Sequence, residues 1–110
     1  MAWLVRDGDV LAALDVVTLS LPGRAVAGVK DLESALLLRR LPLVLQTFTA
    51  GVAVDVAFCD RDMQVRHTVC LGRHGMTLHR PGAACAVVAR SGAFERWALA
   101  PGDLLEVKGG

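Results

Sequence analysis

The chain has 110 residues, of which 54% are hydrophobic and 21% charged, and its formal net charge is +1. This length and composition predict a single folded domain over residues 1–110 and exclude an intrinsically disordered chain. A charge so close to zero creates no strong field around the molecule, so neither a nucleic-acid partner nor a membrane partner is expected.

The beginning of the chain and the cysteines indicate a compartment. Charge appears early, at Arg6 and Asp7, and no apolar stretch has the length of a signal peptide or of a membrane span. Three cysteines, Cys59, Cys70 and Cys85, favour reduced thiols, and no disulfide between Cys59 and Cys70 is expected. We therefore expect a soluble cytoplasmic protein.

The first predicted element is a β-hairpin. Two apolar-rich runs, 3–6 and 10–17, flank the dipeptide Asp7-Gly8. Glycine tolerates the positive φ that the favoured two-residue turn requires, so this pattern is a strong hairpin signal. The dipeptide Pro22-Gly23 then indicates a loop, and residues 24–33 are compatible with one helical turn or with coil.

The middle of the chain predicts further strands. Two apolar runs, 35–39 and 43–48, are separated by a turn that contains proline. The clearest pair of strands follows at 52–59 and 63–71, joined by a short polar turn. Residues 72–82 are rich in Gly, His and Pro and predict a polar loop.

The last part of the chain predicts a strand, a short helix and a final strand. Residues 84–90 form an apolar run, after which Ser91 is the predicted helix N-cap. Phe94, Trp97 and Ala98 are spaced to share one apolar face of the helix, and a Pro-Gly-Asp turn leads to the strand 104–107. Seven or eight short strands with one helix predict a mainly β domain, barrel-like or jelly-roll-like.

The register of the central hairpin follows from its alternation. Pairing Phe58 with Val65 brings apolar residues opposite apolar residues on one face. In this register Asp55 faces Thr68 and lies diagonal to Arg66.

Asp55 is the most informative polar residue, because a carboxylate within an aliphatic strand needs a partner. The structural interpretation is an ion pair with Arg66 or a hydrogen bond from a turn amide near Gly51. The functional interpretation is a site carboxylate in the mouth of a barrel. The candidate ligand-binding residues are therefore Asp55, Arg66 and His67.

No metal site, cofactor site or catalytic nucleophile is expected. The side chains of metal-ligating type in this region are His67, Cys70, His74, His79 and Cys85. His67 and Cys70 are three apart on one strand and point to opposite faces, so no metal and no cofactor are predicted. The basic residues of segment 61–80 are interpreted as solvated loop charge. No nucleophile, phosphate-loop or dinucleotide motif occurs.

Several segments together resemble a known family. They are Ala35–Leu38, Thr47-Phe48, Val54–Phe58 and the long block Gly92–Val107, which carries the sequence Ala-Pro-Gly-Asp-Leu. In this order and spacing the chain resembles the prokaryotic domain-of-unknown-function family 192, over nearly its whole length. The resemblance implies a compact β-barrel-like or jelly-roll-like fold and a bacterial origin. Asp55 is retained, whereas Gln46 stands where the family typically has Trp or His, so this is a divergent member.

Two functions remain open. The favoured one is a non-enzymatic binding or accessory module for a protein or a small ligand. The alternative is a small enzyme or ligand-processing site centred on Asp55 with Arg66. The missing catalytic constellation favours the binding module.

Overall fold

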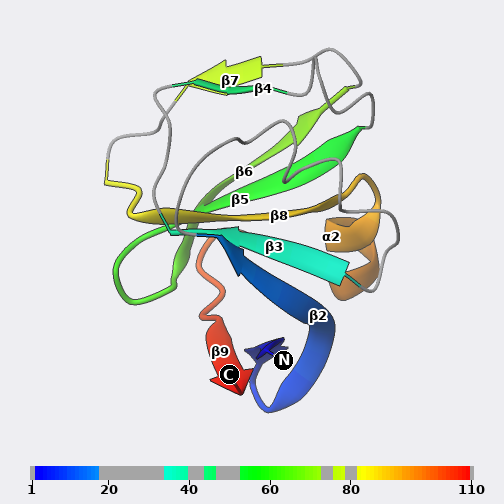
Figure 1. The fold of residues 1–110 in the computed structure, drawn as a ribbon, viewed down its shortest axis with the longest axis vertical. Coiled ribbons are helices and arrows are strands. Elements are labelled where there is room, and N and C mark those ends of the chain that lie inside the picture. The colour runs from blue at the N-terminus through cyan, green and yellow to red at the C-terminus, as the bar shows by residue number, and fades with distance from the viewer. Residues whose placement is uncertain are drawn as a thin grey trace.

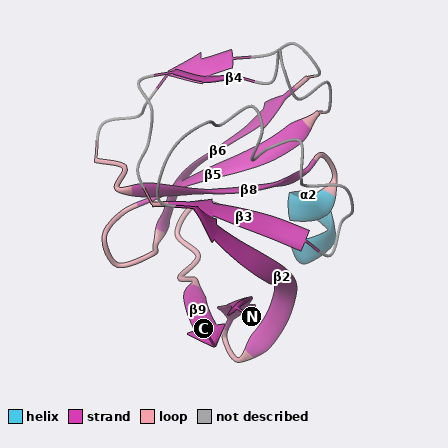
Figure 2. Cartoon of the chain, viewed as in Figure 1, coloured by secondary structure: helices cyan, strands magenta, loops and turns pink. Residues whose placement is uncertain are grey.

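The structure is a computed structural model that describes residues 2–17, 34–39, 44–46, 53–72, 76–78 and 82–109. Within these ranges the chain is mostly strand with one short helix (Figure 2). The elements are β1 (Ala2–Arg6), β2 (Asp9–Val17), β3 (Ser34–Leu38), β4 (Val44–Gln46), β5 (Val54–Cys59), β6 (Val65–Leu71), β7 (Met76–Leu78), β8 (Cys85–Arg90), α2 (Ala93–Trp97) and β9 (Glu106–Gly109). The expected mainly β fold is confirmed.

Seven strands form one sheet in the order β6-β5-β8-β3-β2-β1-β9, while β4 and β7 pair separately (Figure 1). Neighbouring strands of the large sheet are antiparallel except β2 and β3, which are parallel. Because β9 pairs with β1, the two ends of the chain lie beside each other.

The two edges of this sheet are bridged by the segment that leads into β9. The amide of Val65 donates to the carbonyl of Asp103 at 2.8 Å, and the amide of Gly102 donates back to Val65 at 2.7 Å. Leu105 also donates to the carbonyl of Met63 at 3.0 Å. The strand ladder itself is not closed, so the barrel-like or jelly-roll-like description fits only loosely.

The first hairpin forms as predicted. Asp7 and Gly8 both have positive φ, 52° and 84°, which is the conformation of the favoured two-residue turn. Arg6 and Asp9 pair across it.

The central strands are buried on both faces, which explains their continuous aliphatic runs. All six residues of β5 are buried, as are five of the six in β8. One face belongs to a cluster that includes Leu4, Leu14, Leu37, Ala57, Val87, Phe94, Trp97 and Leu105. The other face belongs to a second cluster: Leu36, Leu38, Val54, Val56, Phe58, Leu71, Ala86 and Val88.

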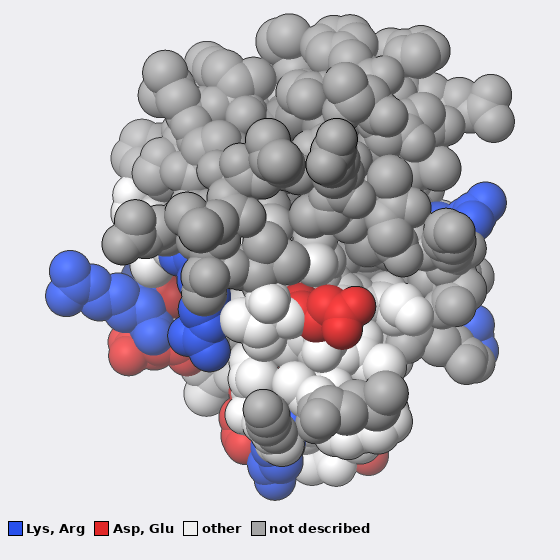
Figure 3. Space-filling view, in the orientation of Figure 1, with Lys and Arg blue, Asp and Glu red and all other residues white. Residues whose placement is uncertain are grey.

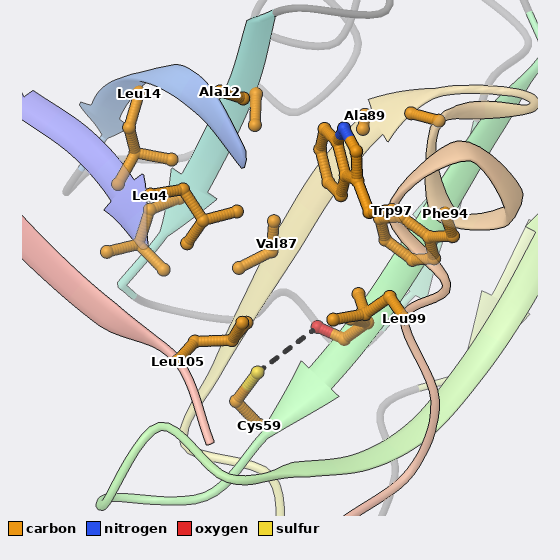
Figure 4. Close-up of a cluster of buried hydrophobic side chains, with 14 of the residues drawn as sticks. Leu4, Ala12, Leu14, Cys59, Val87, Ala89, Phe94, Trp97, Leu99 and Leu105 are labelled. Carbon is orange, nitrogen blue, oxygen red and sulfur yellow. Dashed lines mark hydrogen bonds between the residues drawn. The ribbon is translucent and has the colours of Figure 1, made fainter. Parts of the chain in front are cut away.

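Helix α2 covers one end of the first cluster (Figure 4). The rings of Phe94 and Trp97 lie 5.6 Å apart between centroids, and Trp97 is only 6% exposed. Leu99, which follows the helix, packs into the same cluster. The predicted apolar face is confirmed for Phe94 and Trp97, whereas Ala98, predicted on the same face, is exposed and forms the C-cap of the helix with φ 53°.

The predicted register of the β5–β6 hairpin is wrong by two residues, because Phe58 lies opposite His67 rather than Val65. The turn holds one residue more than predicted, and in it the Asp60 carboxylate accepts hydrogen bonds from the amides two and four residues ahead, at 2.9 and 3.1 Å. A β-bulge between Phe58 and Cys59 adds the second residue of the shift. Because of the bulge, Val65 lies on the face opposite to the predicted one, in the core cluster of Cys59 rather than that of Phe58.

Three smaller predictions are also corrected. The N-cap of α2 is Gly92, with φ 99°, and not Ser91, whose hydroxyl lies 3.5 Å from the thiol of Cys70. Strand β7 lies within the predicted loop 72–82. The last strand begins at Glu106, later than predicted.

Some predictions concern residues outside the described ranges: the loop predicted around Pro22-Gly23, the helical turn or coil of residues 24–33, the turn near Gly51, and the side chains of His74 and His79. Among the residues that are described, no helix is long and apolar enough to cross a bilayer.

Replacing the buried indole tests the packing of α2. We expect Trp97→Ala to lower the free energy of unfolding by about 3–5 kcal/mol, because a large ring is removed from a closed core. Chemical denaturation of both proteins measures the difference. Trp3→Ala is the matched control, since Trp3 is 41% exposed and its loss should be much smaller. Equal losses in the two variants would contradict the packing described here.

Candidate functional site

Asp55 holds the beginning of α2. Its Oδ2 accepts hydrogen bonds from the backbone amides of Gly92 at 3.0 Å and Phe94 at 3.2 Å. Gly92 provides no side-chain cap of its own. The free amides at a helix start carry partial positive charge, so a carboxylate from β5 supplies the missing cap. Asp55 is only 7% exposed, and these bonds satisfy the buried charge.

Arg6 holds the other end of the same helix. Its Nη2 donates to the carbonyl of Trp97 at 2.6 Å, and its Nη1 donates to the carbonyl of Ala98 at 3.2 Å. Nη1 also lies 3.0 Å from Oδ2 of Asp103, forming an ion pair. That carboxylate accepts a further bond from the amide of Ala100 at 3.0 Å. A positive charge at the carboxyl end of a helix is favourable, as is a negative charge at its start.

Two hollows lie on either side of α2. The larger, of about 660 Å³, is here called the binding groove. It is lined by Trp3, Arg6, Asp9, Val10, Leu11, Ala12, Ala13, Ser34, Arg96 and Trp97. The smaller, of about 360 Å³, is here called the Asp55 hollow. It is lined by Asp55, Thr68, Val69, Cys70, Ser91, Gly92, Phe94 and Glu95.

The binding groove combines exposed apolar surface with charge. Trp3 and Val10 are large hydrophobic side chains that remain exposed within the folded domain. Two arginines, Arg6 and Arg96, line the groove against one acid, Asp9. A concave surface with an aromatic ring and a few charged groups is typical of ligand sites.

The structure does not bring the three predicted site residues together. Asp55 lies opposite Cys70, on the face of the β5–β6 hairpin that faces α2. His67 lies opposite Phe58, and alternation puts its side chain on the other face. Arg66 is 62% exposed and bonds elsewhere.

The predicted ion pair between Asp55 and Arg66 is wrong, because Nε of Arg66 donates to Oδ2 of Asp60 at 2.9 Å. Desolvation raises the pKa of Asp60, but hydrogen bonds from the Gln64 amide, from Arg66 and from the Asp62 amide lower it overall. The alternative prediction, a backbone amide as partner of Asp55, gave the right kind of group at a different turn.

Sequence reasoning missed Trp3, Arg6 and Arg96 as neighbours. Arg6 precedes the Asp7-Gly8 turn and contacts residues more than 90 positions away. No local sequence pattern therefore predicts these contacts. Trp3 lies in an alternating strand, and its exposure is visible only in the structure, so no signal in the sequence indicates it either.

The cysteines are all free thiols, including Cys59 and Cys70, for which no disulfide was expected. Within the described ranges no three His, Cys, Asp or Glu side chains gather closely enough to share a metal ion.

Comparisons with protein-family models and with curated proteins each found no match. Two solved structures are similar to this chain. One, from Sinorhizobium meliloti 1021, is described as a "putative transcription regulator"; the TM-score is 0.75 and the identity 16%, over 96% of this chain and 91% of that chain. The other, a protein of unknown function from Novosphingobium aromaticivorans DSM 12444, has a TM-score of 0.75 and 15% identity, over 96% and 82%. At such low identity these comparisons show a shared fold.

A double-mutant cycle tests the role of Asp55. We expect Asp55→Ala to lower the free energy of unfolding by about 1–3 kcal/mol, because two helix amides lose a charged acceptor. Arg66→Gln should change stability little, since Arg66 is exposed. The double mutant should equal the sum of the single variants within about 0.5 kcal/mol, as expected for residues without shared partners. Strong coupling in denaturant melts would show that Asp55 and Arg66 do interact.

Proposed function

We propose that the domain is a non-enzymatic binding or accessory module whose ligand occupies the binding groove. The observation that carries this proposal is the exposed ring of Trp3 in a hollow of about 660 Å³. Large apolar side chains that stay exposed in a concave surface mark places where another molecule removes them from water.

The lining of the groove indicates the chemistry of the ligand. Trp3, Val10 and Leu11 offer apolar contact, and a flat indole favours stacking with another ring. Two arginines and one aspartate line the groove, but Arg6 is already paired with Asp103, so the lining gives no clear preference for the charge of the ligand. The ligand is a small molecule or a protein segment that carries an apolar ring.

The alternative function is a small enzyme or ligand-processing site centred on Asp55. The Asp55 hollow supports it, since Asp55, Thr68 and Ser91 line one cavity. The geometry supports it less than the binding module, because Oδ2 of Asp55 already accepts two helix amides and Arg66 bonds to Asp60. A general acid or base needs a proton-transfer partner within reach.

We also propose that the chain is a divergent bacterial member of family 192 and acts in the cytoplasm. The order of segments that carries the resemblance supports this, above all the block Gly92–Val107. Both similar structures come from bacteria.

Nucleic acid is the less favoured partner, although the Sinorhizobium meliloti protein is described as a "putative transcription regulator". The net charge of +1 gives little attraction for phosphates. On the face shown in Figure 3, the positive and negative side chains of the described residues are interspersed rather than gathered in one basic surface.

Titration with naphthalene-2-carboxylate, an aromatic anion, tests the groove. We expect amide chemical shifts to change at the groove residues of β1, β2 and α2 in the ¹⁵N-labelled protein. Trp3→Ala should weaken this binding about fivefold or more, since stacking on an aromatic ring contributes about 1 kcal/mol. Leu104→Ala is the matched control, because Leu104 is exposed outside the groove.

Three results would overturn the proposal. These are shifts confined to the Asp55 hollow, equal binding by the Trp3→Ala variant, and no binding at millimolar probe. A fluorescence-anisotropy titration with a random DNA duplex completes the test. A dissociation constant well below the micromolar range at physiological salt would make nucleic acid the partner instead.

A further inference from the structure

Three sulfur-bearing side chains meet at the end of the β5–β6 hairpin. Cys59 and Cys85 lie opposite each other on the neighbouring strands β5 and β8. Sγ of Cys85 lies 3.5 Å from Sδ of Met63, in the turn that follows β5. Both cysteines are buried, and Met63 packs against the same core cluster. Figure 4 shows Cys59 beside Leu105 within this cluster.

The backbone of Met63 is in an unusual conformation. Its φ is 63°, in the left-handed region that favours glycine. Two hydrogen bonds fix it there: its amide donates to the carbonyl of Asp60 at 3.1 Å, and its carbonyl accepts from Leu105 at 3.0 Å. A glycine would meet these backbone demands with less strain. In this conformation the Met63 side chain packs against the core, and its thioether lies against the thiol of Cys85.

The two thiols differ in their acidity. A hydrogen bond from Cys59 lowers the pKa of Cys85, and Arg39 lowers it further, against the effects of burial and of Asp60. The same hydrogen bond, with burial, raises the pKa of Cys59. The shared hydrogen bond places the two thiols in contact with each other.

We propose that Cys59, Cys85 and Met63 form a binding site for a soft monovalent metal ion, Cu(I). Thiolate and thioether sulfurs are the ligands that Cu(I) prefers. Zinc sites usually take four ligands, and no third His, Cys, Asp or Glu among the described residues joins the two thiols. This site is separate from the binding groove and does not depend on the function proposed for it.

Binding leaves the oxidation state of the metal and of sulfur unchanged. Each thiol that becomes a ligand gives its proton to solvent, and the thioether binds through a lone pair. Starting from two neutral thiols, a single Cu(I) ion therefore releases about two protons and leaves a complex with one negative charge. The positive charge of Arg39, which acts on Cys85, partly compensates the negative charge of the complex.

The affinity of the reduced protein for Cu(I) is measured without oxygen, in competition with bicinchoninate. We expect a single Cu(I) per chain, with binding that weakens as the pH falls because protons compete for the thiolates. Cys85→Ser should abolish binding. Met63→Leu, which conserves volume, should weaken binding about tenfold or more. Removing a residue that only hydrogen-bonds to a metal ligand already lowers metal affinity about tenfold, and here a ligand itself is removed. Cys70→Ser is the matched control, because Cys70 is exposed on β6, and its affinity should not change.

A second measurement keeps the proposal testable if a buried cysteine variant does not fold. Ag(I), a redox-inert substitute, is added to the ¹⁵N-labelled wild-type protein. The largest amide shifts should fall at residues 59–64 and at Cys85. Unchanged affinity in Met63→Leu, loss of binding in Cys70→Ser, or silver shifts centred elsewhere would each overturn the proposal. So would formation of a Cys59–Cys85 disulfide in place of the metal complex.

Discussion

The shape of both hollows depends on the contacts that fix the two ends of the five-residue helix α2. A helix this short has no stability of its own in water, because nucleation is unfavourable and few hydrogen bonds repay it. Here Asp55 of β5 binds its first amides and Arg6 of β1 binds its last carbonyls. The two charges come from strands that are not neighbours in the sheet, so the stability of the helix depends on the folded sheet. Its residues then line the binding groove on one side and the Asp55 hollow on the other.

The local elements could be predicted from the sequence, since their signals are local. The Asp7-Gly8 turn, the aliphatic strands and the apolar face of α2 each depend on residues a few positions apart. The register of β5 and β6 could not be predicted, because alternation reveals neither the length of a turn nor the position of a β-bulge. It is decided by the Asp60 carboxylate, which lengthens the turn, and by the pairing of β6 with residues 102–105. That pairing joins segments nearly 40 residues apart.

The candidate site could be predicted only in part, because some of its residues give a signal in the local sequence and others do not. A carboxylate in an apolar strand requires a partner wherever it lies, so Asp55 stands out in the sequence alone. Which partner it has depends on the fold: the amides at the start of α2 stand beside it, whereas Arg66 lies at the turn and bonds to Asp60. Arg6 and Trp3 give no such signal, because one looks like an ordinary charge before a turn and the other like an ordinary strand residue. Only the packing of β1 against β2 and α2 makes them neighbours in a groove.

The distribution of charge also bears on the choice between catalysis and binding. Asp55, Arg6, Asp103, Asp60 and Arg66 are each engaged in hydrogen bonds or ion pairs that hold the fold. Releasing any of them to move a proton would weaken a helix end or a turn, so these groups are poorly suited to general acid–base chemistry. Among the described residues, the exposed indole of Trp3 and the sulfurs of Cys59, Cys85 and Met63 in the core cluster take no part in these contacts. Stacking and soft-metal coordination, as proposed above, would use such groups without disturbing the charges that hold α2.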